Sequence, residues 1–398
     1  MTPAARVQGA IDLLDAILAA AKGGGASADR VASEWFRARR YAGGGDRRAI
    51  RELTWRAIRS CGEAPESGRA AMLLVAKTDD QLAALFDGST PHAPLPHVQG
   101  EPIAKPGIAP PWLIGALKAS DIPGPEFAAL LERAPLDIRA NRLKTTREAL
   151  REALRETLPV AGEPIAAPDG LRFPAGTPAE TWPQFGEGLF EIQDGGSQLA
   201  CAALRVQPGE AVVDLCAGAG GKTLALAAAL DNRGTLLACD TDRTRLQRLT
   251  PRAERAGAIV ETRLLDPGKE LDSLADWHES ADAVLVDAPC SGTGTWRRNP
   301  ETRWRLRPAD IDRHAALQAR LLDLAAALVK PGGRIGYVVC SLLDAEGADQ
   351  AAAFLARHTG WRAADVNPGA GRSRGTGYRL TPFHDHTDGF FFTVLQRL

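Results

Sequence analysis

The chain has 398 residues, a formal net charge of −1 and six cysteines, and these values exclude several classes of protein. A chain of this length suits two or three domains, each large enough to bury a core. No apolar run reaches the roughly 18 residues of a membrane span, and cysteines without a CxxC pair fit neither a disulfide framework nor a zinc site. We expect a cytoplasmic, monomeric globular protein without metal, in which nucleic-acid binding requires local basic patches.

Residues 1–88 are expected to form a helical domain. Apolar residues recur there at helical spacing, and the glycine-rich stretches 23–25 and 43–45 are expected to separate its helices. Asp12 and Asp15 interrupt the apolar run near the N-terminus, which favours an amphipathic helix over a signal peptide.

A basic region lies within this helical segment. Residues 1–60 carry 11 Lys or Arg against 6 Asp or Glu, a local charge of +5. These arginines form either a solvated helix face or an RNA-binding surface, and the neighbouring Trp35, Tyr41 and Trp55 favour RNA. The arginines expected to contact RNA here are Arg39, Arg40, Arg47 and Arg48.

A proline-rich stretch, residues 89–111, is expected to be an extended linker between domains, because proline cannot continue a helix. The next segment, 112–185, predicts a small α+β module. In it, LDIRANRL at 136–143 alternates like a half-buried strand. A helix is expected to follow Thr146 as its N-cap. Its apolar stripe consists of Leu150, Leu154 and Leu158.

From residue 186 to residue 398, short apolar strands alternate with Ala- and Leu-rich helices. This alternation predicts an α/β domain with a parallel, doubly wound sheet. The strand segments in chain order are AVVDLC, TLLACD, VETRLLD, ADAVLVDAP and GRIGYVVCS. The final GFFFTVLQRL is expected to join as an antiparallel edge strand.

The end of the first of these strands carries the glycine-rich turn DLCAGAGGKT, at 214–223. Its spacing matches neither a P-loop nor a GxGxxG fingerprint. The first four strands end in an acid, and Asp240 follows the glycines at the distance expected for a carboxylate that binds ribose hydroxyls. One strand-end acid alone is as easily an N-cap or turn former. Four acids without a phosphate-binding loop suit S-adenosylmethionine, which is cationic and lacks phosphate.

Two cysteines, Cys290 and Cys340, follow the ends of the fourth and fifth strands. A lone cysteine is more often a small core hydrophobe, which is the expectation for Cys61, Cys201 and Cys239. A thiolate at a strand end can instead add to C6 of cytosine and make C5 nucleophilic, while Asp287 beside Cys290 holds N3 of the base. His384 and His386, two residues apart without a third ligand, indicate a turn rather than a zinc site.

The motifs DLCAGAGGKT, DAPCSGTGTWRRNPE, VVCSLLDAEGADQ and HTDGFFFTVLQR, in this order, resemble those of the Sun (Fmu) family of RNA cytosine-5 methyltransferases. The resemblance implies a class I (Rossmann-like) methyltransferase domain. LDIRANRLKTT resembles the family's RNA-binding module, which would place Arg139 and Asn141 at the RNA. RRYAGGGDRRAIRELTW resembles a NusB-like helical domain of family members that act on small-subunit (16S) ribosomal RNA.

The resemblance also assigns roles to residues. It makes Cys340 the nucleophile and Cys290 the residue that assists product release, with Asp287 shared between cofactor and base. The cofactor residues carried over are Cys216, Ala217, Gly218, Ala219, Gly220, Gly221 and Lys222, with Asp240 at the ribose and Asp266 near the adenine. Ala219 replaces the usual proline and Val339 the usual threonine, and neither change removes a group that the mechanism requires.

Two other functions fit parts of this pattern. In a DNA cytosine-5 methyltransferase the Pro-Cys cysteine would attack, and Cys340 together with the RNA-type N-terminal half argues against that function. In an inactive RNA-binding assembly factor the catalytic residues would be dispensable, yet all of them are present.

Overall fold

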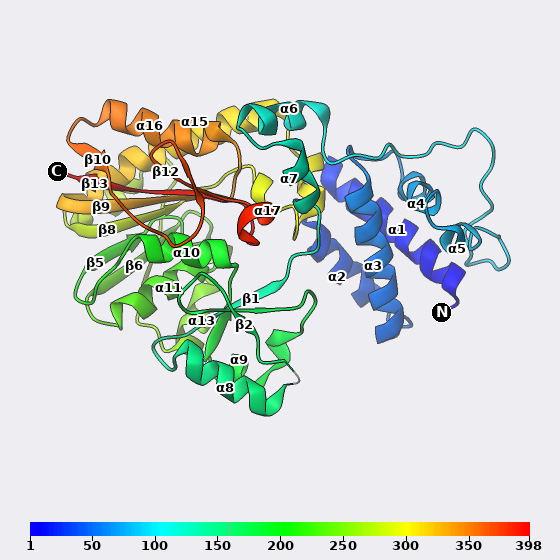
Figure 1. The fold of residues 1–398 in the computed structure, drawn as a ribbon, viewed down its shortest axis with the longest axis horizontal. Helices are drawn as coiled ribbons and strands as arrows, with labels where there is room; N and C mark the ends of the chain where they lie inside the picture. The colour runs from blue at the N-terminus through cyan, green and yellow to red at the C-terminus, as the bar shows by residue number, and fades with distance from the viewer. Residues whose placement is uncertain (159) are drawn as a thin grey trace. The chain divides into compact units, whose positions relative to one another are not determined.

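The computed structural model describes residues 1–158 and 160–398 and divides into two units, each continuous in its contacts but not in sequence (Figure 1). The helical unit comprises Met1–Glu132 and Thr295–Pro308, and the sheet unit comprises Arg133–Gly294 and Ala309–Leu398. Within the described residues, no helix combines the length and the apolarity that a membrane crossing requires.

The helical unit contains the helices expected within residues 1–88 and two more between residues 111 and 129, a stretch that was expected to belong to the α+β module. Side chains of Thr2, Ser27 and Ser67 cap the first, second and fourth helices by accepting a hydrogen bond from a first-turn backbone amide. The apolar stripe of the first helix packs with the third and fourth helices into one core. The helices are α1 (Pro3–Lys22), α2 (Ala28–Ala38), α3 (Gly44–Ser60), α4 (Gly68–Ala76), α5 (Asp80–Ala83), α6 (Pro111–Ala119) and α7 (Gly124–Ala129).

The proline-rich stretch 89–111 differs from the extended linker that was expected. Its second half packs against the helical unit: Ala104 N donates to Ala70 O at 3.0 Å, and Gly62 N donates to Lys105 O at 3.3 Å. Ile103 lies against the core. Proline excludes this segment from a helix but does not prevent it from packing. The boundary between the two units therefore does not fall in residues 89–111 but at residue 132.

The helical unit also includes a segment that the sequence pattern assigned to the catalytic domain. Residues 295–308 form the short 3₁₀ helix η4 (Pro300–Trp304), whose Arg303 is fully buried. The Arg303 guanidinium donates to the backbone oxygens of Ile58 and Cys61, at the end of α3, at 2.7 and 2.8 Å. Glu301 accepts a hydrogen bond from the first amide of α2. The chain therefore runs from the Pro-Cys motif directly into the helical unit.

The first part of the sheet unit is a small antiparallel sheet with strand order β2-β3-β1-β4. The predicted strand and helix of this module are confirmed, with Thr146 as the N-cap and Leu150 and Leu154 buried. The fourth strand lies beyond the expected boundary at residue 185. The elements are β1 (Leu136–Ala140), α8 (Arg147–Thr157), β2 (Glu163–Pro164), β3 (Gly170–Phe173), η1 (Ala179–Thr181), α9 (Pro183–Gly186) and β4 (Phe190–Ile192).

The large sheet has the order β11-β12-β13-β9-β8-β5-β6-β7, and β10 also pairs with β13. The five strands from β9 to β7 are parallel, as predicted. The strands are β5 (Ala211–Asp214), β6 (Thr235–Asp240), β7 (Glu261–Leu264), β8 (Ala281–Asp287), β9 (Val329–Val339), β10 (Trp361–Ala363), β11 (Arg372–Arg374), β12 (Gly377–Leu380) and β13 (Phe390–Arg397).

Helices cover both faces of this sheet, which is the doubly wound arrangement that was predicted (Figure 1). Two helices, α15 and α16, pack on one face, and α10, α11 and α13 pack on the other. The helices are α10 (Gly195–Ala203), α11 (Gly221–Leu230), α12 (Arg243–Leu246), α13 (Leu249–Ala256), α14 (Glu270–Ser273), α15 (Pro308–Leu328), α16 (Ala348–Arg357) and α17 (Pro382–Asp385), with 3₁₀ turns η2 (Ala275–Trp277), η3 (Thr293–Thr295) and η5 (Asp344–Glu346).

The last strand is antiparallel, as expected, but it is not at the edge. β13 pairs with β9 through Phe391 to Gln396 and with β12 on its other side. Its residues are apolar on both faces and buried, which fits an interior position. The two cysteine-bearing strands, β8 and β9, are neighbours, with Asp287 beside Val338.

Candidate active site

The carboxyl ends of the parallel strands bring the predicted site residues to one edge of the large sheet. The loop after β5 holds the glycine-rich turn, β6 ends at Asp240, and β8 ends at Asp287. Cys290 and Cys340 follow β8 and β9. Because ligands of doubly wound sheets bind outside the carboxyl ends of the strands, this edge is the candidate active site.

The glycine-rich turn has a backbone that only glycine accommodates easily. Gly220 has φ +88°, and a Cβ there would lie 2.1 Å from Leu249 Cδ1. Beside Gly221, in contrast, a Cβ would meet nothing within 4 Å, so the first turn of α11 is open to a ligand. The hydroxyl of Thr223 in that turn donates a hydrogen bond to Asp214 Oδ2, with 2.7 Å between the two oxygens.

The four strand-end acids do not all face a ligand. Asp214 is fully buried, and this burial raises the pKa of its carboxyl to about 7. Its carboxyl accepts the hydrogen bond from Thr223 and thereby holds the glycine-rich turn. Asp240 accepts hydrogen bonds from Gly218 N and Asp242 N at 2.7 and 2.8 Å. A carboxylate has about four acceptor positions, so two remain on Asp240 for hydroxyl groups. Asp266 is exposed two residues beyond β7.

Asp287 is paired with Lys222, a contact that sequence reasoning did not predict. The Lys222 ammonium lies 2.7 Å from Asp287 Oδ2, and the lysine side chain is only 12% exposed. Burial alone would lower the pKa of Lys222, but the neighbouring Asp287 carboxylate raises it above the usual lysine value. The lysine therefore stays charged and fixes the Asp287 carboxylate at the end of β8.

The two strand-end cysteines lie in direct contact. Cys290 Sγ and Cys340 Sγ are 3.4 Å apart, both are free, and both side chains are partly exposed. The hydrogen bond to Cys340, together with burial, raises the pKa of the Cys290 thiol well above its usual value. Either sulfur can donate in this contact. Such a pair places two sulfurs within reach of one bound base.

The cysteines expected in the core are found there. Cys61, Cys201 and Cys239 are buried, and burial raises their thiol pKa values to about 11, 11 and 12. A thiol of such high pKa is inert as a nucleophile near neutral pH.

The basic region of the helical unit divides into exposed and engaged arginines. Arg40 and Arg48 are exposed. Arg39 stacks over Trp35 at 3.9 Å, and Arg47 Nε donates to Ala42 O at 2.8 Å. Two of the aromatic neighbours expected to stack on RNA, Trp35 and Trp55, are buried in the core, whereas Tyr41 is 72% exposed. Trp35 and Trp55 therefore stabilise the helices rather than offer a stacking surface.

Arg139 and Asn141, expected at the RNA, lie in the interior of the sheet unit. Arg139 is 5% exposed and donates to Gln193 and to Gly221 O. Asn141 is 3% exposed and donates to Gly188 O and Ala256 O. Because these donors are engaged internally, the two side chains join the small sheet to the helices of the large one.

His384 lies in the short helix α17, and His386 follows it with a left-handed backbone, just before β13. This agrees with the turn that was predicted there. Across residues 1–158 and 160–398, no group of three His, Cys, Asp or Glu side chains is arranged to hold a metal ion.

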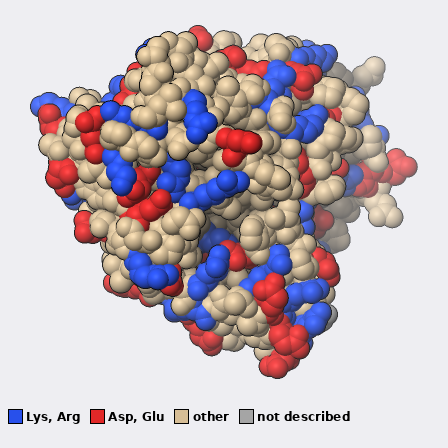
Figure 2. All heavy atoms as spheres, turned by 60° about the vertical axis from the view of Figure 1, so that its left-hand side comes forward, with Lys and Arg blue, Asp and Glu red and all other residues tan. Residues whose placement is uncertain are grey.

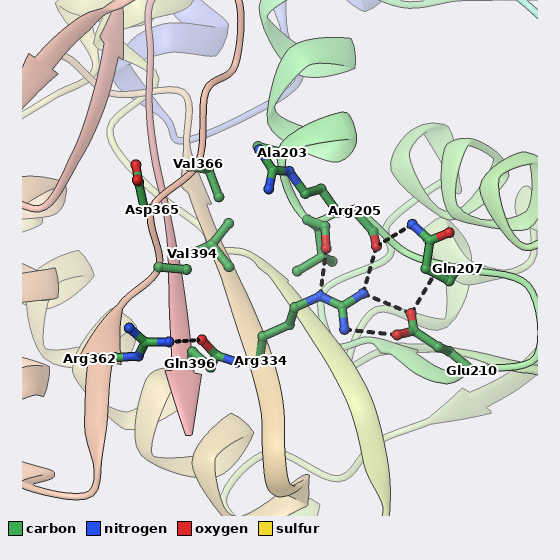
Figure 3. A pocket seen from close by; sticks show the side chains of 12 residues that line it. Ala203, Arg205, Gln207, Glu210, Arg334, Arg362, Asp365, Val366, Val394 and Gln396 are labelled. Atoms are coloured by element: carbon green, nitrogen blue, oxygen red, sulfur yellow. Dashed lines mark hydrogen bonds and ion pairs between the residues drawn. The ribbon is translucent and has the colours of Figure 1, made fainter. Parts of the chain in front are cut away.

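A pocket of about 380 Å³ lies at the opposite, amino edge of the large sheet (Figure 3). Arg334 is held there by both carboxylate oxygens of Glu210, at 2.9 and 2.8 Å, and by the backbone oxygens of Leu204 and Arg205. Arg362 donates to Gln396. These contacts join β9 to the segment that leads into β5, and Arg362 to β13.

Comparison with known proteins identifies the family. A profile described as 16S rRNA methyltransferase RsmB/F matches residues 201–396. The ribosomal RNA small subunit methyltransferase B of Shewanella oneidensis is 35% identical over 293 residues, which are 72% of this chain and 67% of that protein. The probable ribosomal RNA small subunit methyltransferase B of a Synechocystis species is 38% identical over 272 residues, 66% of this chain and 60% of that protein.

The chain thus spans between 60% and 67% of the length of these curated relatives. The crystal structure of the protein PH0851 superposes on 98% of this chain and 99% of its own, with a TM-score of 0.77 and 26% identity. Together with the carboxyl-edge site, these similarities show that the chain belongs to the family described as 16S rRNA methyltransferase RsmB/F.

Proposed function

We propose that this chain transfers a methyl group from S-adenosylmethionine to C5 of a cytosine in 16S ribosomal RNA. The observation that carries this proposal is the contact between Cys290 and Cys340, 3.4 Å apart, at the strand ends beside Asp287. Family membership supports the choice of RNA and of the small ribosomal subunit.

The residues at the carboxyl edge fit S-adenosylmethionine. The acceptor positions left on Asp240 suit ribose hydroxyls, the open first turn of α11 leaves room for backbone approach, and the exposed Asp266 lies past the neighbouring strand, on the side proposed for the adenine. The edge offers carboxylates and no phosphate-binding loop, which suits a sulfonium. When bound, this cofactor supplies the electrophilic methyl group.

The residues of the chain then perform the covalent steps. The Cys340 thiol gives up its proton to N3 of the cytosine and its sulfur adds to C6, while the electrons of the C5=C6 bond move to C5, which becomes the nucleophile. The Asp287 carboxylate, fixed by Lys222, accepts a hydrogen bond from the protonated N3 and stabilises this intermediate. After methylation, C5 gives its proton to water, the C5=C6 bond re-forms, the S–C6 bond breaks, and the Cys340 sulfur takes back the proton from N3. Cys290 assists this release.

Bisulfite sequencing of total RNA and, separately, of genomic DNA tests the substrate directly. A strain lacking this gene is expected to lose one or more 5-methylcytosines from 16S RNA and to regain them with the wild-type gene. Loss from DNA alone would favour the DNA methyltransferase alternative. Full methylation in the deletion strain, with no binding of S-adenosylmethionine by calorimetry, would favour the inactive assembly factor.

Asp240→Ala is expected to weaken S-adenosylmethionine binding by about 1.5–3 kcal/mol, the range for hydrogen bonds to a charged group. Isothermal titration calorimetry measures this affinity without RNA. Asp272→Ala is the matched control, because Asp272 is an exposed acid on α14. Equal affinity of Asp240→Ala and wild type would remove Asp240 from the cofactor site.

Replacing Arg40 and Arg48 by alanine is expected to flatten the salt dependence of RNA binding. Both are exposed arginines in a region of charge +5, and removing one phosphate-binding cation changes the log–log slope by about 0.7 for single-stranded RNA. On the face drawn in Figure 2, positive and negative side chains are interspersed. The control replaces Arg51 and Arg56, which pair with Asp29 and Asp79. If the variant without Arg40 and Arg48 has the wild-type slope, these two arginines do not contact RNA and only face solvent.

A further inference from the structure

One buried carboxylate, Glu346, joins the two loops that carry the cysteines. It lies in the turn η5 after β9 and is fully buried. Its Oε1 accepts a hydrogen bond from Ser291 N at 2.8 Å, and its Oε2 accepts one from Ser341 Oγ at 2.6 Å and another from Ser291 Oγ. Ser291 directly follows Cys290, and Ser341 directly follows Cys340. Glu346 therefore holds both cysteines through their next residues.

Further contacts strengthen the same connection. Gly294 N donates to Cys340 O at 3.0 Å, and Thr293 Oγ1 accepts from Leu342 N at 2.9 Å. The hydroxyl of Tyr337 donates to the backbone oxygen of Glu346. These bonds tie the loop after β8 to the loop after β9 with Glu346 at their centre.

The carboxylate of Glu346 is kept ionised despite its burial. Burial alone would raise the pKa of Glu346, but His314, whose Nδ1 lies 3.3 Å away, and the hydroxyl groups of Ser291 and Ser341 bring it below its usual value. An ionised carboxylate accepts several donors at once, whereas an amide of the same size offers one oxygen and a donor in place of the second.

We propose that Glu346 is a positioning residue that fixes the separation of the Cys290 and Cys340 sulfurs. This inference rests on the proposed function and deepens it, because one sulfur must attack C6 and the other must assist release from the same base. A misplacement of about 1 Å between reacting groups costs on the order of 100-fold in rate. Glu346 itself touches neither sulfur in this arrangement and acts through Ser291 and Ser341.

The sulfur separation is measurable without RNA or cofactor. Diamide oxidises two adjacent thiols to a disulfide, taking up two protons and two electrons as it is reduced to the hydrazine. In the wild type we expect rapid formation of the Cys290–Cys340 disulfide, read by peptide mass spectrometry. In Glu346→Gln we expect the rate to fall at least about tenfold, since the amide lacks the second acceptor and the loops separate.

Glu210→Gln is the matched control. Glu210 is also a carboxylate with little exposure, but it binds Arg334 at the opposite edge of the sheet (Figure 3). This variant tests whether weakening any carboxylate interaction in the sheet unit slows the disulfide, and the expected rate is that of the wild type. A wild-type disulfide rate in Glu346→Gln, or an equal fall in both variants, overturns the proposal.

The second readout is the reaction itself. Glu346→Gln is expected to lower kcat on RNA about 100-fold while the KM for RNA and the affinity for S-adenosylmethionine stay within about twofold. A rise in KM with kcat unchanged contradicts a positioning role. If Glu346→Gln does not fold, Ser341→Ala replaces it. This variant removes one hydroxyl, which donates to Glu346 and accepts from Leu343 N, and it is expected to slow the disulfide and lower kcat by smaller factors. No effect on either overturns the proposal. Because the disulfide rate needs no substrate, an inactive wild type would contradict the proposed function alone.

Discussion

Cys340→Ala is expected to bind RNA and S-adenosylmethionine but to form no covalent adduct, whereas Cys290→Ala is expected to methylate once and stall as a protein–RNA conjugate. Cys340 makes the bond to C6, so its loss removes the intermediate. Cys290 assists the breaking of that bond, so its loss allows methylation and lowers turnover by about 10²–10⁴-fold, the range for general acid–base assistance. Denaturing electrophoresis with labelled RNA separates the two results.

The geometry supports this division of roles. The Cys290 and Cys340 sulfurs lie 3.4 Å apart, so a base held by one sulfur at C6 is within reach of the other, and one cysteine can attack while its neighbour assists release. Cys61→Ala is the control, since Cys61 is buried in the helical unit and no adduct involves it. A conjugate that accumulates with Cys340→Ala would reverse the two roles, and no conjugate with either variant would contradict the covalent mechanism.

The neighbouring positions of Cys290 and Cys340 could be predicted from the sequence. Strands that alternate with helices form parallel sheets, and the fourth and fifth segments are one strand–helix–strand step apart. The structure confirms that β8 and β9 are adjacent. The distance of 3.4 Å between the Cys290 and Cys340 sulfurs could not be predicted, because it depends on the turns after the strands. Those turns are set by Glu346, whose two partner serines are 55 and 5 residues away in sequence.

The roles of individual polar residues were harder to predict. Asp214 and Asp240 both end strands and are both buried, yet Asp214 holds Thr223 whereas Asp240 accepts from two backbone amides and retains further acceptor positions. Periodicity gives the strand and its end but not the rotamer of the last residue. Arg139 and Asn141 show the same limit, because a polar residue in a short strand contacts RNA or the interior depending on which helix packs over it.

The assignment of residues 295–308 depended on contacts that no local pattern reveals. The sequence TWRRNPETRW continues the Pro-Cys motif, which placed it in the catalytic domain. Its Arg303 instead binds residues about 240 positions earlier, at the end of α3. A helix end leaves its last carbonyl groups without intrahelical partners, and any donor in the chain can satisfy them. Here the donor arrives with the segment that follows the catalytic loop.

Arg303→Met is therefore expected to destabilise the C-terminal turn of α3 by about 2–4 kcal/mol. The guanidinium is fully buried and donates to the oxygens of Ile58 and Cys61. Without it, the Ile58 oxygen keeps only the longer bond from Cys61 N at 3.4 Å and the Cys61 oxygen the one from Trp304 Nε1 at 3.3 Å, and a hydrogen bond to a charged group contributes about 1.5–3 kcal/mol. Part of this loss is offset, because burial lowers the pKa of Arg303 to about 10, which shows that the buried cation is itself unfavourable. Methionine has a similar reach and removes that cost.

Hydrogen exchange of the α3 amides in the full-length protein measures this effect, because it reports the local opening of α3. A global unfolding experiment would combine the stabilities of the two units in one value. Arg305→Met is the control: Arg305 donates to Gly25 O and Ala26 O from a partly exposed position, so we expect less than about 1 kcal/mol. Arg303→Lys should lie between the two, since an ammonium cannot reproduce the planar fork that serves both carbonyls. Unchanged exchange in α3 for Arg303→Met would mean that removing the buried charge compensates fully for the missing hydrogen bonds. Residues 295–308 would then be held to the helical unit by apolar packing, such as that of Trp304 against its core.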